Sequence, residues 1–390
     1  MIVTPLSGRL NAVRDALLSH GWEGDLASVT AGGLDRAAFH VTGIDESVAE
    51  AMVPLASRLG LELVTGDGWL LLIGGRSRLG AFARPWVQPE AVQALATAIG
   101  MALPPELDAG WRHARGTIPL DRPVIVGVVN ITPDSFSDGG GMLNVDDALH
   151  RVDELLAGGA TVVDVGGEST RPGAEPVPID VERARTIPVL EALARRYPEL
   201  PLSIDTVHAA TADAAIGAGA AIVNDVTAGR HDADLIPVAV RHRAGLVLSH
   251  SRGPLGTLAS YDAAEYGGDV TGGVARELAS ALSVASNAGA PRESVVVDPG
   301  FGFAKTAQQS LTLLHQLDAI VALGAPVLVG VSRKRFLGEA TGRDVDDRDR
   351  ATAAACALAY ERGARLFRVH EPAAVRDALF VAAAVAGASR

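Results

Sequence analysis

Two sets of polar residues recur where short apolar runs of this sequence end. The first set combines carboxylate, amide and ammonium groups: Asp205, Asn224, Asp298 and Lys334. Carboxylates accept paired N–H groups, while an amide and an ammonium can serve ring nitrogens and a carbonyl. The set therefore suits a flat heterocycle that carries an amidine group. Each aspartate alone could instead cap a helix. All four residues, however, come where an expected strand ends, and this shared position favours a binding site.

The second set consists of cationic and amide side chains beside glycines and hydroxyl groups: Asn130, Arg171, Arg368 and His370. Such groups near helix starts suit a phosphate or a pyrophosphate. An asparagine oxygen such as that of Asn130 can also hold Mg2+, which takes few protein ligands alongside phosphate oxygens. A lone histidine is more often structural, but the position of His370 beside Arg368 favours anion binding.

A long polar segment follows the apolar run Val124–Val129. It begins at Asn130, contains two carboxylates, three hydroxyl groups and the ring of Phe136, and ends in the three glycines 139–141. Neither a helix nor a strand favours this composition, so we expect a loop. A loop of this kind directly after a buried strand is a candidate for binding a ligand.

The elements that must position these residues alternate from Pro123 onward. We expect strands at Val124–Val129, Thr161–Val165, Pro201–Ile204, Ala221–Val223, Gly245–Leu248, Ser294–Val297, Pro326–Val329 and Arg365–Arg368. We expect helices at Asp146–Ala157, Val181–Arg196, Ala209–Ala218, Ala233–Arg243, Val274–Ala288, Gln308–Ala322, Asp346–Arg362 and Pro372–Ala386. Repeated βα units predict a (β/α)8 TIM barrel, whose post-strand loops converge at one end. An open doubly wound sheet is the alternative, but it would normally carry a glycine fingerprint after its first strand.

The preceding residues predict a small α+β N-terminal domain of unknown role. Its expected strands are Ala37–Val41, Leu61–Thr65 and Trp69–Ile73, and its expected helices are Asp45–Leu59 and Gln88–Ile99. The last two strands form a predicted hairpin that turns at Gly66-Asp67-Gly68. The predicted domain plan is residues 1–102 for this module, 103–117 for a linker and 118–390 for the catalytic barrel.

The composition excludes several other kinds of protein. The chain has 390 residues and a net charge of −12, which disfavours nucleic acid or an anionic membrane surface as the main partner. Its one cysteine, Cys356, cannot form a disulfide within the chain, as expected in a reducing cytoplasm. The first ten residues do not read as a signal peptide, and the apolar runs are shorter than the ~20 residues that span a bilayer. We therefore expect a cytoplasmic enzyme with small-molecule partners.

Several segments resemble the signatures of dihydropteroate synthase. The long matches are Asn130-Ile-Thr-Pro-Asp-Ser-Phe-Ser-Asp-Gly, Asp164-Val-Gly-Gly-Glu-Ser-Thr-Arg-Pro-Gly, Asp298-Pro-Gly-Phe-Gly-Phe and Ser332-Arg-Lys. The short matches Ile204–Thr206, Asn224–Val226 and Arg368–His370 follow in the family's order. The resemblance covers roughly residues 118–390 and implies a pterin-binding TIM barrel. It also implies a homodimer that uses Mg2+ to condense a hydroxymethyl-dihydropterin pyrophosphate with para-aminobenzoate in folate biosynthesis.

The same resemblance implies a role for each matching residue. Pterin would be bound by Asp205, Asn224, Asp298 and Lys334. Mg2+ and pyrophosphate would be bound by Asn130, and pyrophosphate also by Arg368 and His370. Para-aminobenzoate would lie among Phe136, Thr170, Arg171 and Pro172. Asn130, Lys334, Arg368 and His370 are the expected catalytic residues.

Some positions depart from the family pattern. Ser249 and Ser251 flank His250 where the family usually has methionines, so the stacking of the pterin is expected to change.

Two other functions fit part of this sequence pattern. A pterin-dependent corrinoid methyltransferase shares the barrel but needs neither the loop after Asn130 nor the Arg368–His370 triplet. A non-catalytic pterin-binding paralogue would not need both chemical sets to be intact.

Overall fold

The computed structural model describes residues 1–6, 36–75, 79–80, 82–83, 88–103, 110–131, 145–168, 177–321 and 323–388. The chain divides into two compact units. The first consists chiefly of Met1–Pro105, and the second of Glu106–Ile320 with Ala325–Ala388. The boundaries of the domain plan stay a prediction, since most of the expected linker before Gly110 lies outside the described residues.

The first unit contains a four-stranded antiparallel sheet in the order β1-β2-β4-β3. Its elements are β1 (Ile2–Leu6), β2 (Arg36–Thr42), α3 (Glu46–Leu59), β3 (Glu62–Gly66), β4 (Trp69–Gly75) and α5 (Glu90–Ala102). Alternate strand residues such as Phe39 and Leu70 pack with Met52 and Leu95 of the two helices in one core. The expected α+β module is therefore confirmed, with β1 as a strand that the sequence pattern missed.

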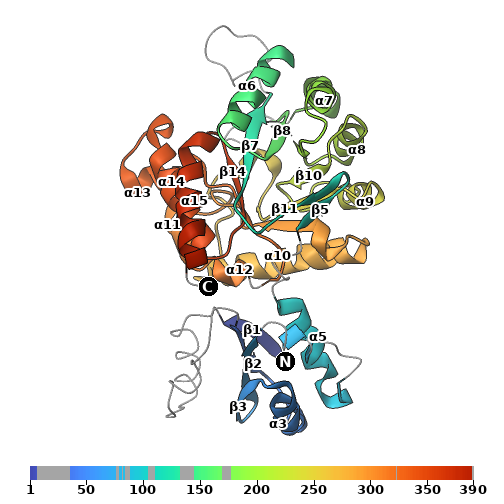
Figure 1. Cartoon of the computed structure of the whole chain (residues 1–390), viewed down its shortest axis with the longest axis vertical. Helices are drawn as coiled ribbons and strands as arrows, with labels where there is room; N and C mark the ends of the chain where they lie inside the picture. Colours follow the sequence, from blue (N-terminus) through green and yellow to red (C-terminus); the bar gives the residue numbers. More distant parts are fainter. Residues whose placement is uncertain are drawn as a thin grey trace. The chain divides into compact units, whose positions relative to one another are not determined.

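The second unit is a (β/α)8 TIM barrel, as predicted (Figure 1). Its parallel strands are β7 (Val124–Asn130), β8 (Val162–Gly166), β9 (Leu202–Asp205), β10 (Ile222–Asp225), β11 (Gly245–Ser249), β12 (Val295–Asp298), β13 (Leu328–Val329) and β14 (Leu366–Val369). They are ordered β12-β11-β10-β9-β8-β7-β14-β13. A parallel bridge between Val297 and Val327 joins the two ends of the sheet.

Helices surround this sheet (Figure 1). They are α6 (Val145–Ala157), α7 (Ile179–Arg196), α8 (Ala209–Gly217), α9 (Leu235–Arg241), α10 (Val270–Asn287), α11 (Ala307–His315), α12 (Asp318–Val321), α13 (Arg335–Thr341), α14 (Asp349–Glu361) and α15 (Pro372–Ala388). The one helix expected at Gln308–Ala322 is two, α11 and α12, and α13 was not expected. No helix in the described part of the chain is both long and apolar enough to cross a membrane.

The alternation of strand residues decides what the barrel interior contains. Val163 and Val165 of β8 face outward and join the core under the helices, whereas Val162 joins an inner cluster. The other inner members are Val124, Val126, Ile222, Val247, Val296, Leu328 and Leu366. Since side chains on a strand alternate between two faces, the next inward positions on β8 and β14 are Asp164 and Arg368. The interior is thus apolar towards the strand starts and polar towards the strand ends.

A short hairpin extends the apolar end of the interior. Its strands are β5 (Trp111–His113) and β6 (Gly116–Ile118), which lie within the stretch expected to be a linker. Trp111 is 1% exposed, belongs to the inner cluster, and donates a hydrogen bond from Nε1 to the Ser294 carbonyl at 3.0 Å. Hairpin and barrel are therefore one packed body, because an indole buried in the barrel core cannot belong to a free linker.

We predict that Trp111→Ala lowers the free energy of unfolding by about 3–5 kcal/mol, the usual cost of removing a buried aromatic side chain. Arg112→Ala is the matched control, because that side chain is 49% exposed and pairs with Glu293 at 3.1 Å. An exposed pair is worth about 0–1 kcal/mol. Urea denaturation followed by circular dichroism measures both, and equal effects would show that the indole does not support the barrel.

Candidate active site

A cavity of about 580 Å³ lies where the barrel strands end. The predicted site residues that the structure describes all line it: Asn130, Asp205, Asn224, Asp298, Lys334, Arg368 and His370. They come from segments far apart in the sequence and meet because parallel strands in a barrel end on the same side. Phe136, Thr170, Arg171 and Pro172 lie outside the described residues.

Arg368 is bonded to two carboxylates inside this cavity. Its Nε donates to Oδ2 of Asp164 at 2.6 Å, and its Nη2 donates to Oδ2 of Asp205 at 2.6 Å. Asn224 donates from Nδ2 to the same Asp164 oxygen at 3.0 Å. Burial alone would lower the pKa of Arg368, but the two carboxylates raise it overall, so the guanidinium stays charged. Burial also raises the pKa of Asp205, and Arg368 opposes that shift.

Asp164 is a site residue that the sequence analysis did not assign a role. It is 1% exposed, and its Oδ1 is buried with no hydrogen-bond partner. A signal for it was available, since a carboxylate in the middle of the otherwise apolar strand β8 needs a cationic partner. The local sequence pattern does not predict that this partner is Arg368.

Asn130 and Asp205 lie on either side of a glycine. Asn130 pairs in register with Gly166, and Gly166 pairs with Asp205. A Cβ atom at Gly166 would lie 3.7 Å from both Oδ1 of Asn130 and Oδ2 of Asp205. The absence of a side chain at Gly166 therefore leaves an amide oxygen and a carboxylate oxygen facing the same small space.

Asp298 and Lys334 are two further charged residues of the cavity wall. Asp298 accepts a hydrogen bond from the Gly300 amide at 2.7 Å through Oδ1, while its Oδ2 faces Gly330, which has no side chain. Burial raises the pKa of Asp298. Burial lowers the pKa of Lys334 to about 8, and its Nζ lies 4.1 Å from the centre of the Phe303 ring. The wall thus combines a carboxylate oxygen, an ammonium and an aromatic ring.

His370 is held by Ser332 of the neighbouring strand end. The Ser332 hydroxyl oxygen accepts a hydrogen bond from the His370 amide at 3.2 Å and lies 3.0 Å from Nδ1 of its ring. Both residues line the cavity. The serine therefore orients the imidazole in the cavity that Arg368 also lines.

Lys305 is another cavity residue to which the sequence analysis gave no role. Its Nζ donates to the carbonyls of Gly300 and Phe303, both at 3.0 Å, and lies 2.9 Å from Nδ1 of His250. Nε2 of His250 is 3.0 Å from Glu277. Burial lowers the pKa of Lys305 to about 7 and that of His250 to about 4. We interpret Lys305 as a positioning residue that holds the loop after β12.

The two serines around His250 differ in what they face. Ser249 lines the cavity, as expected for a residue that replaces an apolar neighbour of the ligand. Ser251 donates a hydrogen bond from its hydroxyl to the Val226 carbonyl at 2.7 Å and is not among the cavity residues. Only Ser249 can therefore alter contacts inside the cavity.

The barrel and its strand-end cavity define a pterin binding enzyme: that family matches residues 126–370. A dihydropteroate synthase of Synechocystis sp. is 40% identical over 265 residues, which cover 68% of this chain and 90% of that protein. The Bacillus subtilis enzyme is 38% identical over 251 residues, covering 64% of this chain and 84% of that protein. The chain belongs to the dihydropteroate synthases, transferases of folate biosynthesis that condense a dihydropterin pyrophosphate with para-aminobenzoate.

Solved structures agree with this assignment. A Xanthomonas albilineans dihydropteroate synthase with 4-aminobenzoic acid is 42% identical with a TM-score of 0.65, over 71% of this chain and 98% of that chain. A Burkholderia cenocepacia enzyme complexed with 7,8-dihydropteroate is 38% identical with a TM-score of 0.65, over 74% of this chain and 98% of that chain. The matching family region begins inside β7, so the first unit lies outside it.

We predict that Arg368→Met lowers the free energy of unfolding by about 3–5 kcal/mol, because it leaves buried carboxylates uncompensated. Loss of the cation raises the folded-state pKa of Asp205 further above its unfolded value. The folded variant then binds more protons than the unfolded chain, so its stability falls as the pH rises. The loss of unfolding free energy relative to wild type should accordingly be larger at pH 8 than at pH 5.5.

The matched control is Arg333→Met. Arg333 also makes two hydrogen bonds to one carboxylate, that of Asp349 at 2.8 and 2.9 Å, but both side chains are more than a quarter exposed. We expect this control to lose no more than about 1 kcal/mol. Urea denaturation at both pH values measures the difference, and a deficit for Arg368→Met that does not change with pH would contradict the charge argument.

Proposed function

We propose that the cavity binds the dihydropterin pyrophosphate with its ring system against Asp205, Asn224, Asp298 and Lys334. The observation that carries this assignment is that Asp298 is 7% exposed, lines the cavity and has its Oδ2 close to Gly330, where a Cβ would lie 3.5 Å away. A carboxylate of this kind gains from a ligand N–H and loses from a ligand without one. The cavity of about 580 Å³ also falls in the range of small-molecule sites, about 300–1,000 Å³.

The pyrophosphate group is assigned to Arg368, His370 and Asn130. In the reaction the C–O bond between the pterin methylene and the pyrophosphate breaks, and negative charge accumulates on the leaving group. Cationic and amide donors fixed at that position stabilise this charge more than they stabilise the ground state. Arg368 is already oriented by Asp164 and Asp205, so little reorganisation is required.

Mg2+ fits the donors next to this position. Oδ1 of Asn130 and Oδ2 of Asp205 face the space beside Gly166, and Mg2+ prefers oxygen ligands shared with phosphate groups. In this proposal Asn130 holds the ion, which neutralises pyrophosphate charge when it is bound. Arg368 carries a positive charge next to this position and repels a cation. In this proposal Mg2+ therefore binds here only together with an anion such as pyrophosphate.

Para-aminobenzoate is the proposed nucleophile. Its amine nitrogen forms the new C–N bond to the pterin methylene carbon and then loses a proton. An arylamine has low basicity, so the attack requires no strong base, and we assign none. Phe136, Thr170, Arg171 and Pro172 remain assigned to the aminobenzoate by resemblance. The 4-aminobenzoic acid complex of the Xanthomonas albilineans relative supports this choice of substrate.

A homodimer working in the cytoplasm completes the proposal. The support for the dimer is the family resemblance. The support for the compartment is that the chain has a single cysteine, Cys356, and so forms no disulfide within itself, as is usual in a reducing cytoplasm.

The overall function is tested by mixing the full chain with the dihydropterin pyrophosphate, para-aminobenzoate and Mg2+. We expect 7,8-dihydropteroate and pyrophosphate in equal amounts, and neither product when the aminobenzoate is omitted. Mass spectrometry detects the coupled product. Pyrophosphate release without coupling would indicate a hydrolase and would contradict the assignment.

We predict that Asp298→Asn weakens pterin binding by about 2–5 kcal/mol, the scale for breaking one partner of a desolvated charged hydrogen bond. Asp225→Asn is the matched control. That carboxylate also ends a strand and is fully buried, but it accepts hydrogen bonds from Thr227 and Gly229 and does not line the cavity. Calorimetric titration with a pterin should show a large loss for the first variant only. Equal losses would remove Asp298 from the pterin site.

A further inference from the structure

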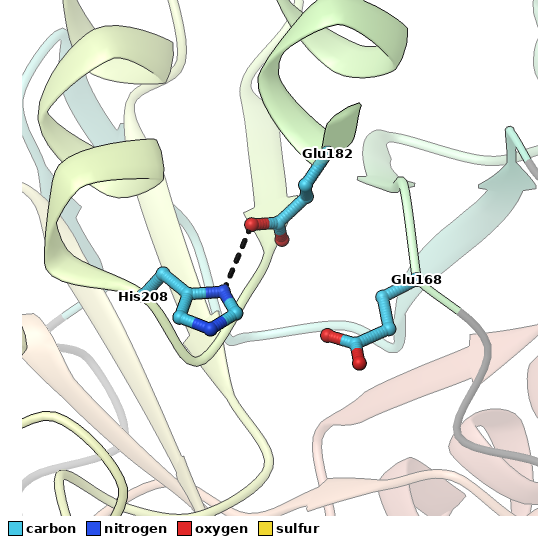
Figure 2. Close-up of side chains that lie close together, drawn as sticks. All are labelled: Glu168, Glu182 and His208. Atoms are coloured by element: carbon cyan, nitrogen blue, oxygen red, sulfur yellow. Dashed lines mark hydrogen bonds and ion pairs between the residues drawn. The ribbon is translucent and has the colours of Figure 1, made fainter. Parts of the chain in front are cut away.

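Three side chains from separate segments converge beside the end of β8 (Figure 2). Glu168 follows β8, Glu182 lies in the first turn of α7, and His208 immediately precedes α8. Each offers one ligand atom, and these atoms all lie within 4.8 Å of one another. Two carboxylates and an imidazole are thus gathered outside the set of residues assigned to the reaction.

The carboxylate of Glu182 is incompletely satisfied where it is buried. Its side chain is fully buried, and its Oε2 accepts from the Thr211 hydroxyl at 2.6 Å and lies 3.0 Å from Nδ1 of His208. The other oxygen, Oε1, is buried and has no hydrogen-bond partner among the residues that the structure describes. A buried acceptor without a partner is costly, so this atom points to a group that the cluster can still bind.

The chemistry of the cluster selects a cation. Burial is the main cause that raises the pKa of Glu168, and the nearby Glu182 raises it further, as expected for carboxylates that repel each other. Glu168 accepts one hydrogen bond, from the Val177 amide at 3.2 Å. A divalent ion would neutralise both carboxylates at once. Mg2+ prefers oxygen alone, whereas carboxylates combined with an imidazole are typical ligands of Zn2+ and related transition metals.

The ligand atoms must move closer together to hold such an ion. Tetrahedral Zn2+ lies about 2.0–2.2 Å from oxygen and nitrogen ligands, which places two ligand atoms roughly 3.3–3.6 Å apart. The observed separations are no more than 4.8 Å, so binding requires the side chains to rotate towards one another. We propose that Glu168, Glu182 and His208 form a binding site for a divalent transition-metal ion, distinct from the Mg2+ position at Asn130.

This site would lie close to the substrate. Glu168 also lines the large cavity, so one of the metal ligands would belong to its wall. Glu168 and Val177 flank residues 169–176, which the resemblance assigns in part to the aminobenzoate. The proposal does not depend on the proposed reaction, because the cluster can bind a metal whether or not the cavity binds a pterin.

The test is a Zn2+ titration of the full chain at pH 7.5 in competition with a chromogenic chelator. We expect the wild type to bind one Zn2+ that both Glu182→Gln and His208→Gln weaken by at least about tenfold. Even groups that only support a ligand cost about 10–100-fold in metal affinity. Co2+ in place of Zn2+ adds a spectroscopic signature, since loss of the imidazole should change its visible absorption.

His242→Gln is the matched control. Its imidazole also contacts a carboxylate, with Nε2 2.8 Å from Asp213, but it stands outside the cluster. This variant and Asn130→Ala should both keep the wild-type Zn2+ affinity, and the latter separates this site from the Mg2+ position. Circular dichroism confirms that each variant is folded. No binding by the folded wild type, or wild-type affinity in both cluster variants, would show that the residues form only a hydrogen-bonded pair.

Discussion

The partly buried guanidinium of Arg368 between two carboxylates is the interaction on which the site depends. It joins β14 to β8 and β9 at the level where the barrel interior changes from apolar to polar. Three charges largely removed from water at this level are tolerated only because they pair through hydrogen bonds, which are 2.6 Å long on both sides of the guanidinium. Asn224 extends the pairing to β10 through Asp164. Four strand ends are thus tied together by one charged network before any ligand is bound.

The apolar half of the barrel interior, at the strand starts, makes this network possible. Seven strands contribute inward-facing apolar side chains there, and Trp111 of the β5–β6 hairpin extends their core. The packed apolar layers at the strand starts exclude water from that side of the charged network. Solvent therefore reaches the charges at the strand ends through the cavity. Low local polarity strengthens each interaction inside the cavity and also raises the cost of any unpaired group. The binding site and the core are therefore parts of the same arrangement of strands.

A buried carboxylate oxygen without a hydrogen bond from the described residues lies at each of the two places where a ligand is proposed. Oδ1 of Asp164 and Oε1 of Glu182 are both buried carboxylate oxygens with no hydrogen-bond partner in the described part of the chain. Folded proteins pair nearly all buried polar atoms, so such atoms tend to have a functional reason. One lies below the cavity assigned to the pterin pyrophosphate, and the other lies in the cluster assigned to a transition metal. Lys305, in contrast, satisfies its ammonium with two carbonyls and is assigned a positioning role.

The sequence alone determined the barrel and the seven predicted residues that line the cavity. A strand has period two and a parallel barrel ends all its strands on one side, so Asp205, Asn224 and Asp298 could be assigned to a single site from local pattern. Tertiary structure decided the pairings. Arg368 and Asp164 are 204 residues apart, and no local pattern shows which cation meets a given carboxylate. The same reason explains why the packing of Trp111 in the barrel core and the cluster around Glu182 were missed. Both consist of contacts between distant segments, which exist only after the strands have come together.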